Sequence, residues 1–208
     1  MDSLTPKFTK RDLSFSIFTG LITGILVWRI FLFLNVPEFR DITWSWLIII
    51  IPILWIVGVN LGYFLGRLFS FFNQFGKFAA IGFTNAAIDF GVLNLLIHST
   101  GTTEGFWYGV FKAVSFLAAV IPSYFWNKYW AFWSPGIMPA SLKEFLKFLG
   151  VAVSAILVNS ISATVIATFI DPALGFTPTA WANVAAAAGS ALALIFSFAG
   201  FKVAVFKR

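Results

Sequence analysis

The chain lacks cysteine, contains a single histidine, and has only 11% charged residues over its 208 positions. Without cysteine it has neither a disulfide framework nor a thiolate metal site. His98 alone cannot form a histidine metal cluster, so we expect no metal and no cofactor. Soluble domains carry about 25% charged residues, so this composition excludes an ordinary soluble domain.

Catalytic signatures are also lacking. The sequence shows no Ser–His–Asp arrangement, no paired carboxylates in a polar segment and no glycine-rich phosphate loop. The loops are too short to hold a catalytic domain, so we do not expect an enzyme. The net charge of +6 is spread over short loops instead of forming a patch, and we therefore expect no nucleic-acid partner.

Long apolar runs dominate what is present. Each run reaches or exceeds the roughly 20 residues that a helix needs to cross a bilayer. In lipid the backbone must satisfy its own hydrogen bonds, so these runs should be helical. We predict an all-α membrane protein with six transmembrane helices, over residues 13–36, 43–66, 78–98, 106–132, 145–170 and 179–206.

The positive charges predict the orientation. Most of the 14 Lys and Arg residues fall before the first run, after the last run, or in alternate loops. Positively charged loops stay in the cytoplasm, so both termini should be cytoplasmic. The residues on that side are Lys7, Lys10, Arg11, Arg67, Lys77, Lys128, Lys143, Lys147, Lys202, Lys207 and Arg208.

Two parts of the chain share a pattern, which predicts an internal repeat. The matched pairs are Ser123 and Ser197, Lys128 and Lys202, Phe78 and Phe148, and Asp89 and Asn159. We therefore predict a two-helix transmembrane extension over residues 1–74. A four-helix unit follows over residues 75–208, built from two-helix repeats at about 75–133 and 143–208.

Three charged residues remain inside apolar runs: Arg29, Asp89 and Lys112. Asp89 lies about 16 Å into its helix, near the middle of a core of roughly 30 Å. Burying an acid there costs about 2.5–3.5 kcal/mol, so it needs a partner, a proton or a cavity. Asp89 either locks the bundle, through an ion pair with Lys112 or a hydrogen bond to Asn85, or has a functional role.

Arg29 and Lys112 lie at shallow depth near the outer surface. They either extend toward the headgroups or point inward and form a cationic pocket suited to phosphate. Asn159 adds a neutral amide, a group that often hydrogen-bonds a neighbouring membrane helix.

Asn127 and Lys128 lie among aromatic residues, including Tyr124 and Trp130, at the cytoplasmic end of the fourth run. One interpretation is an interfacial aromatic belt with an anchoring lysine. The other is a headgroup site, with the lysine for phosphate, the amide for sugar or phosphate oxygens, and the rings for a sugar or an isoprenoid. Recurrence of the lysine as Lys202 favours the headgroup site.

Glycines recur every fourth residue, at Gly20 and Gly24 and again at Gly58, Gly62 and Gly66. Small residues at this spacing let membrane helices approach closely. The pattern indicates packing within one chain or, alternatively, a homodimer face.

An ordered set of residues spans the part of the chain from Phe75 to its end. Its members are Lys77, Phe78, Gly82, Asn85, Asp89, Lys112, Ser123, Tyr124, Asn127, Lys128, Trp130, Phe132, Phe145, Phe148, Asn159, Lys202 and Phe206. In this set the chain resembles the GtrA-like family of small four-helix membrane proteins. Three positions depart from the family pattern, which usually has asparagines near Ser197 and Phe201 and a tryptophan at Ala204.

The resemblance implies a plasma-membrane protein that translocates a polyprenyl-phosphate-linked sugar for cell-surface polysaccharide synthesis, often with a membrane glycosyltransferase as partner. Asn127 and Lys128, with Lys202, would engage the headgroup at entry. Lys112 and Arg29 would receive the phosphate outside, with Asp89 as a switchable partner of Lys112.

Two alternatives stay open. One is a proton-coupled exporter of small cations that uses Asp89 and aromatic rings. The other is a non-transporting subunit that anchors a glycosyltransferase through the first two helices.

Overall fold

All described elements are helical, which confirms the all-α prediction for the described part of the chain. The computed structural model describes residues 7–34, 36–38, 43–101, 105–137, 139–172 and 178–206, with side chains left out at 105–106, 108–109, 112–113, 160, 163–164, 167–168, 178–187 and 190. The elements are α1 (Lys10–Phe33), η1 (Trp44–Trp46), α2 (Leu47–Leu65), α3 (Phe72–Thr100), α4 (Gly105–Trp126), η2 (Asn127–Ala131), α5 (Leu142–Phe169), α6 (Pro178–Gly200) and η3 (Phe201–Val205).

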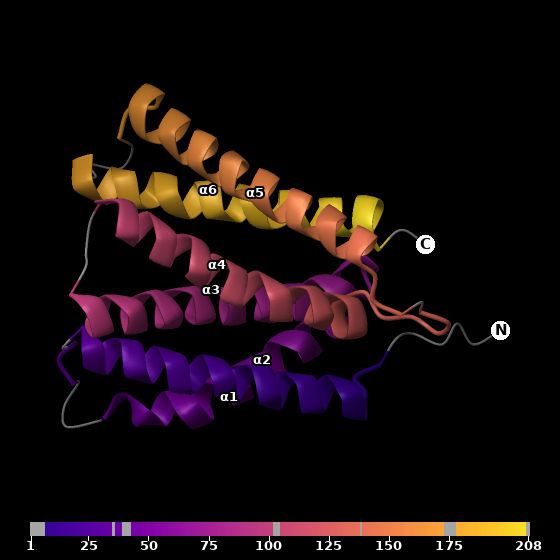
Figure 1. Cartoon of the computed structure of the whole chain (residues 1–208). Coiled ribbons are helices and arrows are strands. Elements are labelled where there is room, and N and C mark those ends of the chain that lie inside the picture. Colours follow the sequence, from indigo (N-terminus) through magenta and orange to yellow (C-terminus); the bar gives the residue numbers. More distant parts are fainter. Residues whose placement is uncertain are drawn as a thin grey trace. The chain divides into compact units, whose positions relative to one another are not determined.

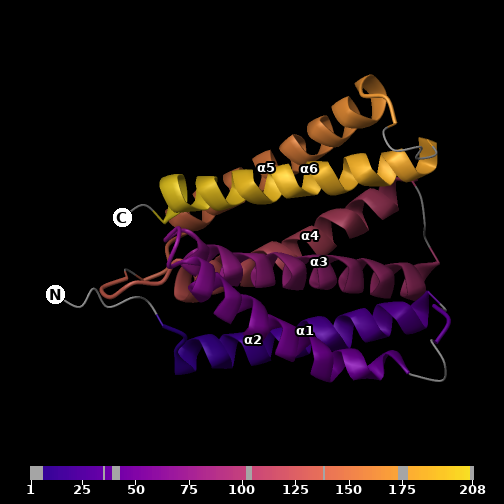
Figure 2. The same ribbon diagram turned by 180° about the vertical axis from the view of Figure 1, so that it is seen from behind.

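The chain forms two compact units, Met1–Pro135 and Gly136–Arg208. In the first unit, consecutive helices run in opposite directions, and α3 packs against α1, α2 and α4 (Figures 1 and 2). The second unit is an antiparallel pair of α5 and α6. Because α3 contacts every other helix of its unit, it is the element that positions the polar groups described below. The predicted division of the chain at residue 74 stays a prediction.

Three helical segments among the described residues are long and apolar enough to cross a membrane: α1, η1 with α2, and α3. The buried positions of α1 are all polar or small. Large apolar side chains face outward instead, and Phe18 is 55% exposed. This reversed arrangement is typical of membrane helices, whose contacts are made by small and polar residues. A multi-pass membrane protein follows from these helices.

Helices α1, α3 and α5 begin three or more residues earlier than predicted. Thr9 caps α1 in a capping box with Asp12, so Lys10 and Arg11 belong to the helix. Helix α3 begins at Phe72, so Lys77 is buried inside it. The prediction that placed Lys77 in a loop was wrong. An apolar run marks only the part of a helix that faces lipid, and α3 begins six residues before that run.

The glycines of α1 and α2 make contacts inside the chain. A Cβ built on Gly20 would lie 2.5 Å from the Cα of Pro52, and one on Gly24 would lie 2.5 Å from the carbonyl oxygen of Leu47. Similarly, a Cβ on Gly62 would lie 3.3 Å from the Cα of Gly76 in α3. These contacts confirm packing within one chain for these glycines. The homodimer stays a prediction.

Helices α4 and α6 both end in a five-residue π-helical turn, η2 and η3, with a lysine in its second position. In η2 the N–H of Phe132 donates to the carbonyl of Asn127 at 2.8 Å. In η3 the N–H of Phe206 donates to the carbonyl of Phe201 at 2.7 Å. Such π turns are rare and are frequently found at functional sites.

The aromatic ring that follows each π turn packs in the same way. The ring centroids of Phe78 and Phe132 are 6.1 Å apart at an interplanar angle of 57°. Those of Phe148 and Phe206 are 6.2 Å apart at 54°. The paired positions of the sequence pattern thus have matching local geometry, each within its own unit.

The glycine contacts give a matched pair of substitutions in α2. Gly62→Ala should lower stability by about 1–3 kcal/mol, because its Cβ would lie 2.9 Å from the carbonyl oxygen of Phe72 and the backbones must separate. Gly58→Ala is the control, because nothing lies within 4 Å of a Cβ at that position. Thermal unfolding in detergent measures both, and equal midpoints would contradict the close α2–α3 contact.

Candidate functional site

Asp12 is the centre of a buried polar cluster at the end of the first unit where α1 and α3 begin. Its carboxylate has no solvent exposure and forms an ion pair with Lys77 Nζ at 2.7 Å. It accepts hydrogen bonds from Tyr63 Oη at 2.9 Å, from Trp130 Nε1 at 3.0 Å, and from the backbone N–H and hydroxyl of Thr9. We call Thr9, Asp12, Tyr63, Lys77 and Trp130 the Asp12 cluster.

Aromatic rings surround the cations of this region. Lys77 Nζ lies 5.0 Å from the ring centroid of Tyr63, and the Arg11 guanidinium lies 3.5 Å from that of Trp133. Phe15 stacks on Trp130 at 5.3 Å. Helix α1 is therefore joined to the turn after α4 by hydrogen bonds, ring stacking and cation–π contact.

Sequence reasoning missed Asp12, because it lies next to Lys10 and Arg11 in a segment that reads as solvated. One signal could have found it. Thr9 followed three residues later by an acid is typical of a helix start, and would have placed Asp12 inside α1.

Asn127, Lys128, Tyr124 and Trp130 are all buried, with Asn127 and Lys128 each 1% exposed. The predicted headgroup residues therefore lie inside the unit, not on its surface. Asn127 Nδ2 donates to the Ser123 carbonyl at 2.9 Å and to its hydroxyl at 3.2 Å.

Asn85 reaches the same serine from α3. Its Nδ2 donates to Ser123 Oγ at 2.5 Å, so the two amides meet at one hydroxyl. The Oδ1 atoms of Asn85 and Asn127 are both buried and have no hydrogen-bond partner among the described residues. Leaving a buried acceptor unpaired costs about 1–3 kcal/mol, so a donor that reached either oxygen would be bound favourably. We call Asn85, Ser123, Asn127 and Lys128 the amide site.

Asp89 lies one helical turn beyond Asn85 and accepts a hydrogen bond from Ser115 Oγ of α4 at 2.5 Å. Lys112 belongs to α4, but its side chain lies outside the described residues, so the Asp89–Lys112 pair stays a prediction. Polar contacts therefore follow the α3–α4 interface from Ser123 to Ser115.

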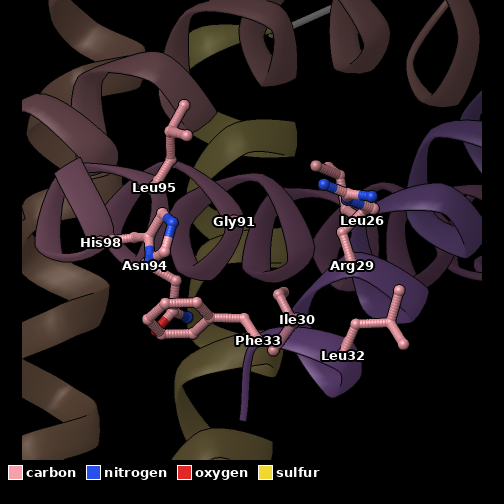
Figure 3. Close-up of a pocket in the computed structure, with 9 residues that line it drawn as sticks. All are labelled: Leu26, Arg29, Ile30, Leu32, Phe33, Gly91, Asn94, Leu95 and His98. Carbon is pink, nitrogen blue, oxygen red and sulfur yellow. The ribbon is translucent and has the colours of Figure 1, made fainter. Parts of the chain in front are cut away.

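Arg29 lies at the other end of the unit, in a cavity between α1 and α3 (Figure 3). Asp89 contacts α4, whereas Arg29 belongs to α1 and lines a cavity on another side of α3. The structure does not bring them into one pocket. Asn94 and His98 line the cavity with Arg29, and sequence reasoning gave them no role.

The second unit holds Lys202 and Asn159. Lys202 is exposed, and its Nζ lies 5.8 Å from the ring centroid of Phe198. Phe201 takes the position that Asn127 has in the first π turn, and it stacks on Phe148 at 4.1 Å. The second unit is therefore apolar at the position where the amide site is polar.

The Asp12–Lys77 pair should dominate the stability of the first unit. Asp12→Asn and Lys77→Met should each lower it by about 3–5 kcal/mol, because each leaves a buried charge without its partner. The double substitution should cost less than the sum of the two. Chemical unfolding in detergent gives all three values, with Lys10→Met, an exposed neighbour, as the control. Strict additivity would show that the two charges are not coupled.

Comparison with known proteins gives one match. No curated protein and no solved structure matches the chain. A family model described as the GtrA/DPMS transmembrane domain matches residues 77–207, which include the amide site and both π turns. Because this match covers more than half of the chain, the GtrA-like resemblance is confirmed, and the protein belongs to the family of the GtrA/DPMS transmembrane domain.

Proposed function

We propose that the protein translocates a polyprenyl-phosphate-linked sugar from the cytoplasmic to the outer leaflet of the plasma membrane, for cell-surface polysaccharide synthesis or modification. The family match supports a membrane function related to lipid-linked sugars. The observation that carries the proposal is the pair of buried carbonyl oxygens without described partners, on Asn85 and Asn127, with the buried Lys128 next to Asn127 in the chain.

The chemistry of the amide site suits such a headgroup. Sugar hydroxyls are donors, and the free Oδ1 atoms of Asn85 and Asn127 are acceptors. Lys128 would pair with the phosphate through charge-assisted hydrogen bonds. Tyr124 and Trp130 are buried beside this site, so a sugar ring or an isoprenoid would reach them only if the packing around them opens. Lys202 would assist at entry from the second unit.

The α3–α4 interface provides the next polar groups along the route that we propose for the headgroup. Asn85 and Ser123 are followed by Asp89 and Ser115, about 6 Å further along α3. In this proposal the arriving phosphate competes with Asp89 for Lys112, and Lys112 and Arg29 receive it on the outer side. Asn159 would take the place of Asp89 in the second repeat.

The proposed topology has six spans, two repeats and cytoplasmic termini. The matching π turns and aromatic pairs of the two units support the repeat. The clustered cations Arg11, Lys77 and Lys128 at one end of the first unit support a cytoplasmic position for that end.

We infer that the protein is not itself an enzyme. A membrane glycosyltransferase that makes the lipid-linked sugar would be its partner, and a homodimer is part of the same proposal. Synthesis inside and consumption outside would drive the flux without a coupling ion. Against the exporter alternative, Lys112 would oppose a cationic substrate that bound near Asp89.

Reconstitution in liposomes tests translocation. With a polyprenyl-phosphate sugar loaded in the membrane, wild-type protein should expose the sugar to an external probe over time. Lys128→Met should slow this exposure at least about tenfold, because a charge-assisted hydrogen bond to phosphate is lost. Lys143→Met, at an exposed position, is the matched control.

Folding of each variant is checked by its elution and unfolding in detergent. Folded protein that gives no exposure would reject translocation in favour of the anchoring subunit. Exposure at the wild-type rate by folded Lys128→Met would remove the amide site from the mechanism.

A further inference from the structure

The cavity between the C-terminal halves of α1 and α3 has a volume of about 440 Å³. This is within the range of about 300–1,000 Å³ that small-molecule sites occupy. Leu26, Ile30 and Leu95 provide apolar walls, and Arg29, Asn94 and His98 are its polar groups (Figure 3). A few polar groups in an apolar cavity are typical of a ligand site.

The polar groups favour an anion. Arg29 forms no ion pair with any described acid, and its guanidinium lies 6.0 Å from the ring centroid of Trp28. A guanidinium binds phosphate through two parallel hydrogen bonds, which makes it well suited to this ligand. The His98 ring packs edge-on against Phe33 at 5.4 Å, which fixes the imidazole at the cavity wall.

The cavity lies far from the Asp12 cluster. Arg29 is about 26 Å from Asp12 along α1, and Asn94 is about 26 Å from Lys77 along α3. This separation approaches the roughly 30 Å thickness of the hydrocarbon core. The cavity and the Asp12 cluster are thus spaced like the two headgroup layers of a bilayer.

Arg29 also lies outside the part of the chain that matches the family model, which begins at residue 77. One wall of the cavity comes from α1, and the other comes from α3 inside the matched part. The N-terminal helix therefore completes a cavity that the matched segment alone would leave open.

We propose that this cavity binds the phosphate group of a single lipid in the leaflet opposite the Asp12 cluster, with Arg29 as its main ligand and Asn94 and His98 as further donors. The isoprenoid or acyl chain would lie along the apolar walls. That the bound lipid is the one the protein translocates rests on the proposed function. The existence of a phosphate site in this cavity does not.

Binding of farnesyl phosphate to the full chain in detergent, followed by thermophoresis, tests the site. Arg29→Gln should weaken binding at least about tenfold. Arg67→Gln is the matched control, because Arg67 is also exposed and lies 5.9 Å from the ring centroid of Phe64, remote from the cavity. Each variant is also measured with Lys128→Met, because the amide site is a second candidate for the same phosphate.

A second variant tests the cavity without changing charge. Gly91 lines the cavity, and a Cβ there would meet only the flexible side chain of Leu26, at 2.9 Å. Gly91→Leu should therefore fill the cavity and weaken farnesyl phosphate binding to a similar extent. Farnesol, which lacks the phosphate, should bind more weakly and should be insensitive to Arg29→Gln.

Unchanged affinity in both Arg29→Gln and Gly91→Leu would overturn the proposal, as would equal losses in Arg29→Gln and Arg67→Gln. Inorganic phosphate binding as tightly as farnesyl phosphate would show an anion site without a lipid. Competition by phosphatidylglycerol at equal concentration would assign the site to bulk phospholipid. If wild-type protein failed to expose the sugar in liposomes but still bound farnesyl phosphate through Arg29, translocation would be rejected and the phosphate site would be retained.

Discussion

A buried carboxylate loses its hydration, which is unfavourable. An ion pair with one cation offsets this loss only when hydrogen bonds also satisfy the remaining lone pairs of the carboxylate. Asp12 meets this condition with an ion pair from α3 and donors from α2, from the turn after α4 and from its own helix start. One acid thereby fixes three helices and a π turn against one another. The N-terminal helices consequently pack within the first compact unit.

The Asp12 cluster and the amide site both use residues of the π turn that contains Trp130. They differ in how well their polar groups are satisfied. In the cluster both carboxylate oxygens of Asp12 have partners, whereas Asn85 and Asn127 each keep an oxygen without a described partner. Unsatisfied acceptors persist only where the surroundings hold them in place. The ion pair and the stacking of Phe15 on Trp130 supply that rigidity one turn away from Asn127. The contacts that hold Trp130 in place thus allow Asn127, at the other end of the turn, to keep an unsatisfied oxygen.

Sequence was sufficient for the helices, because apolar length and backbone satisfaction in lipid dictate them. It also singled out Asn127 and Lys128 as candidates, because the repeat marked the turn that contains them. The Thr9 capping pattern could have placed Asp12 inside α1, but the burial of Asp12 and Lys77 could not be predicted, because it depends on which helices pack together. Nor could the sequence predict that Asn85 and Asn127 meet at Ser123, since that contact joins α3 to α4. The repeat predicted equivalent lysines, yet Lys128 is buried and Lys202 exposed, next to Asn127 and Phe201 respectively.

Helix α3 carries polar groups on two faces, and this restricts any route between the leaflets. Asn85 and Asp89 face α4, whereas Asn94 and His98 face the cavity beside α1. A headgroup that moves along the α3–α4 interface would have to pass around α3 to reach Arg29. Arg29 is exposed, so a lipid can also reach the cavity sideways from the bilayer. We therefore infer that the cavity exchanges lipid laterally with the membrane, because its open side requires no passage through the centre of the bundle.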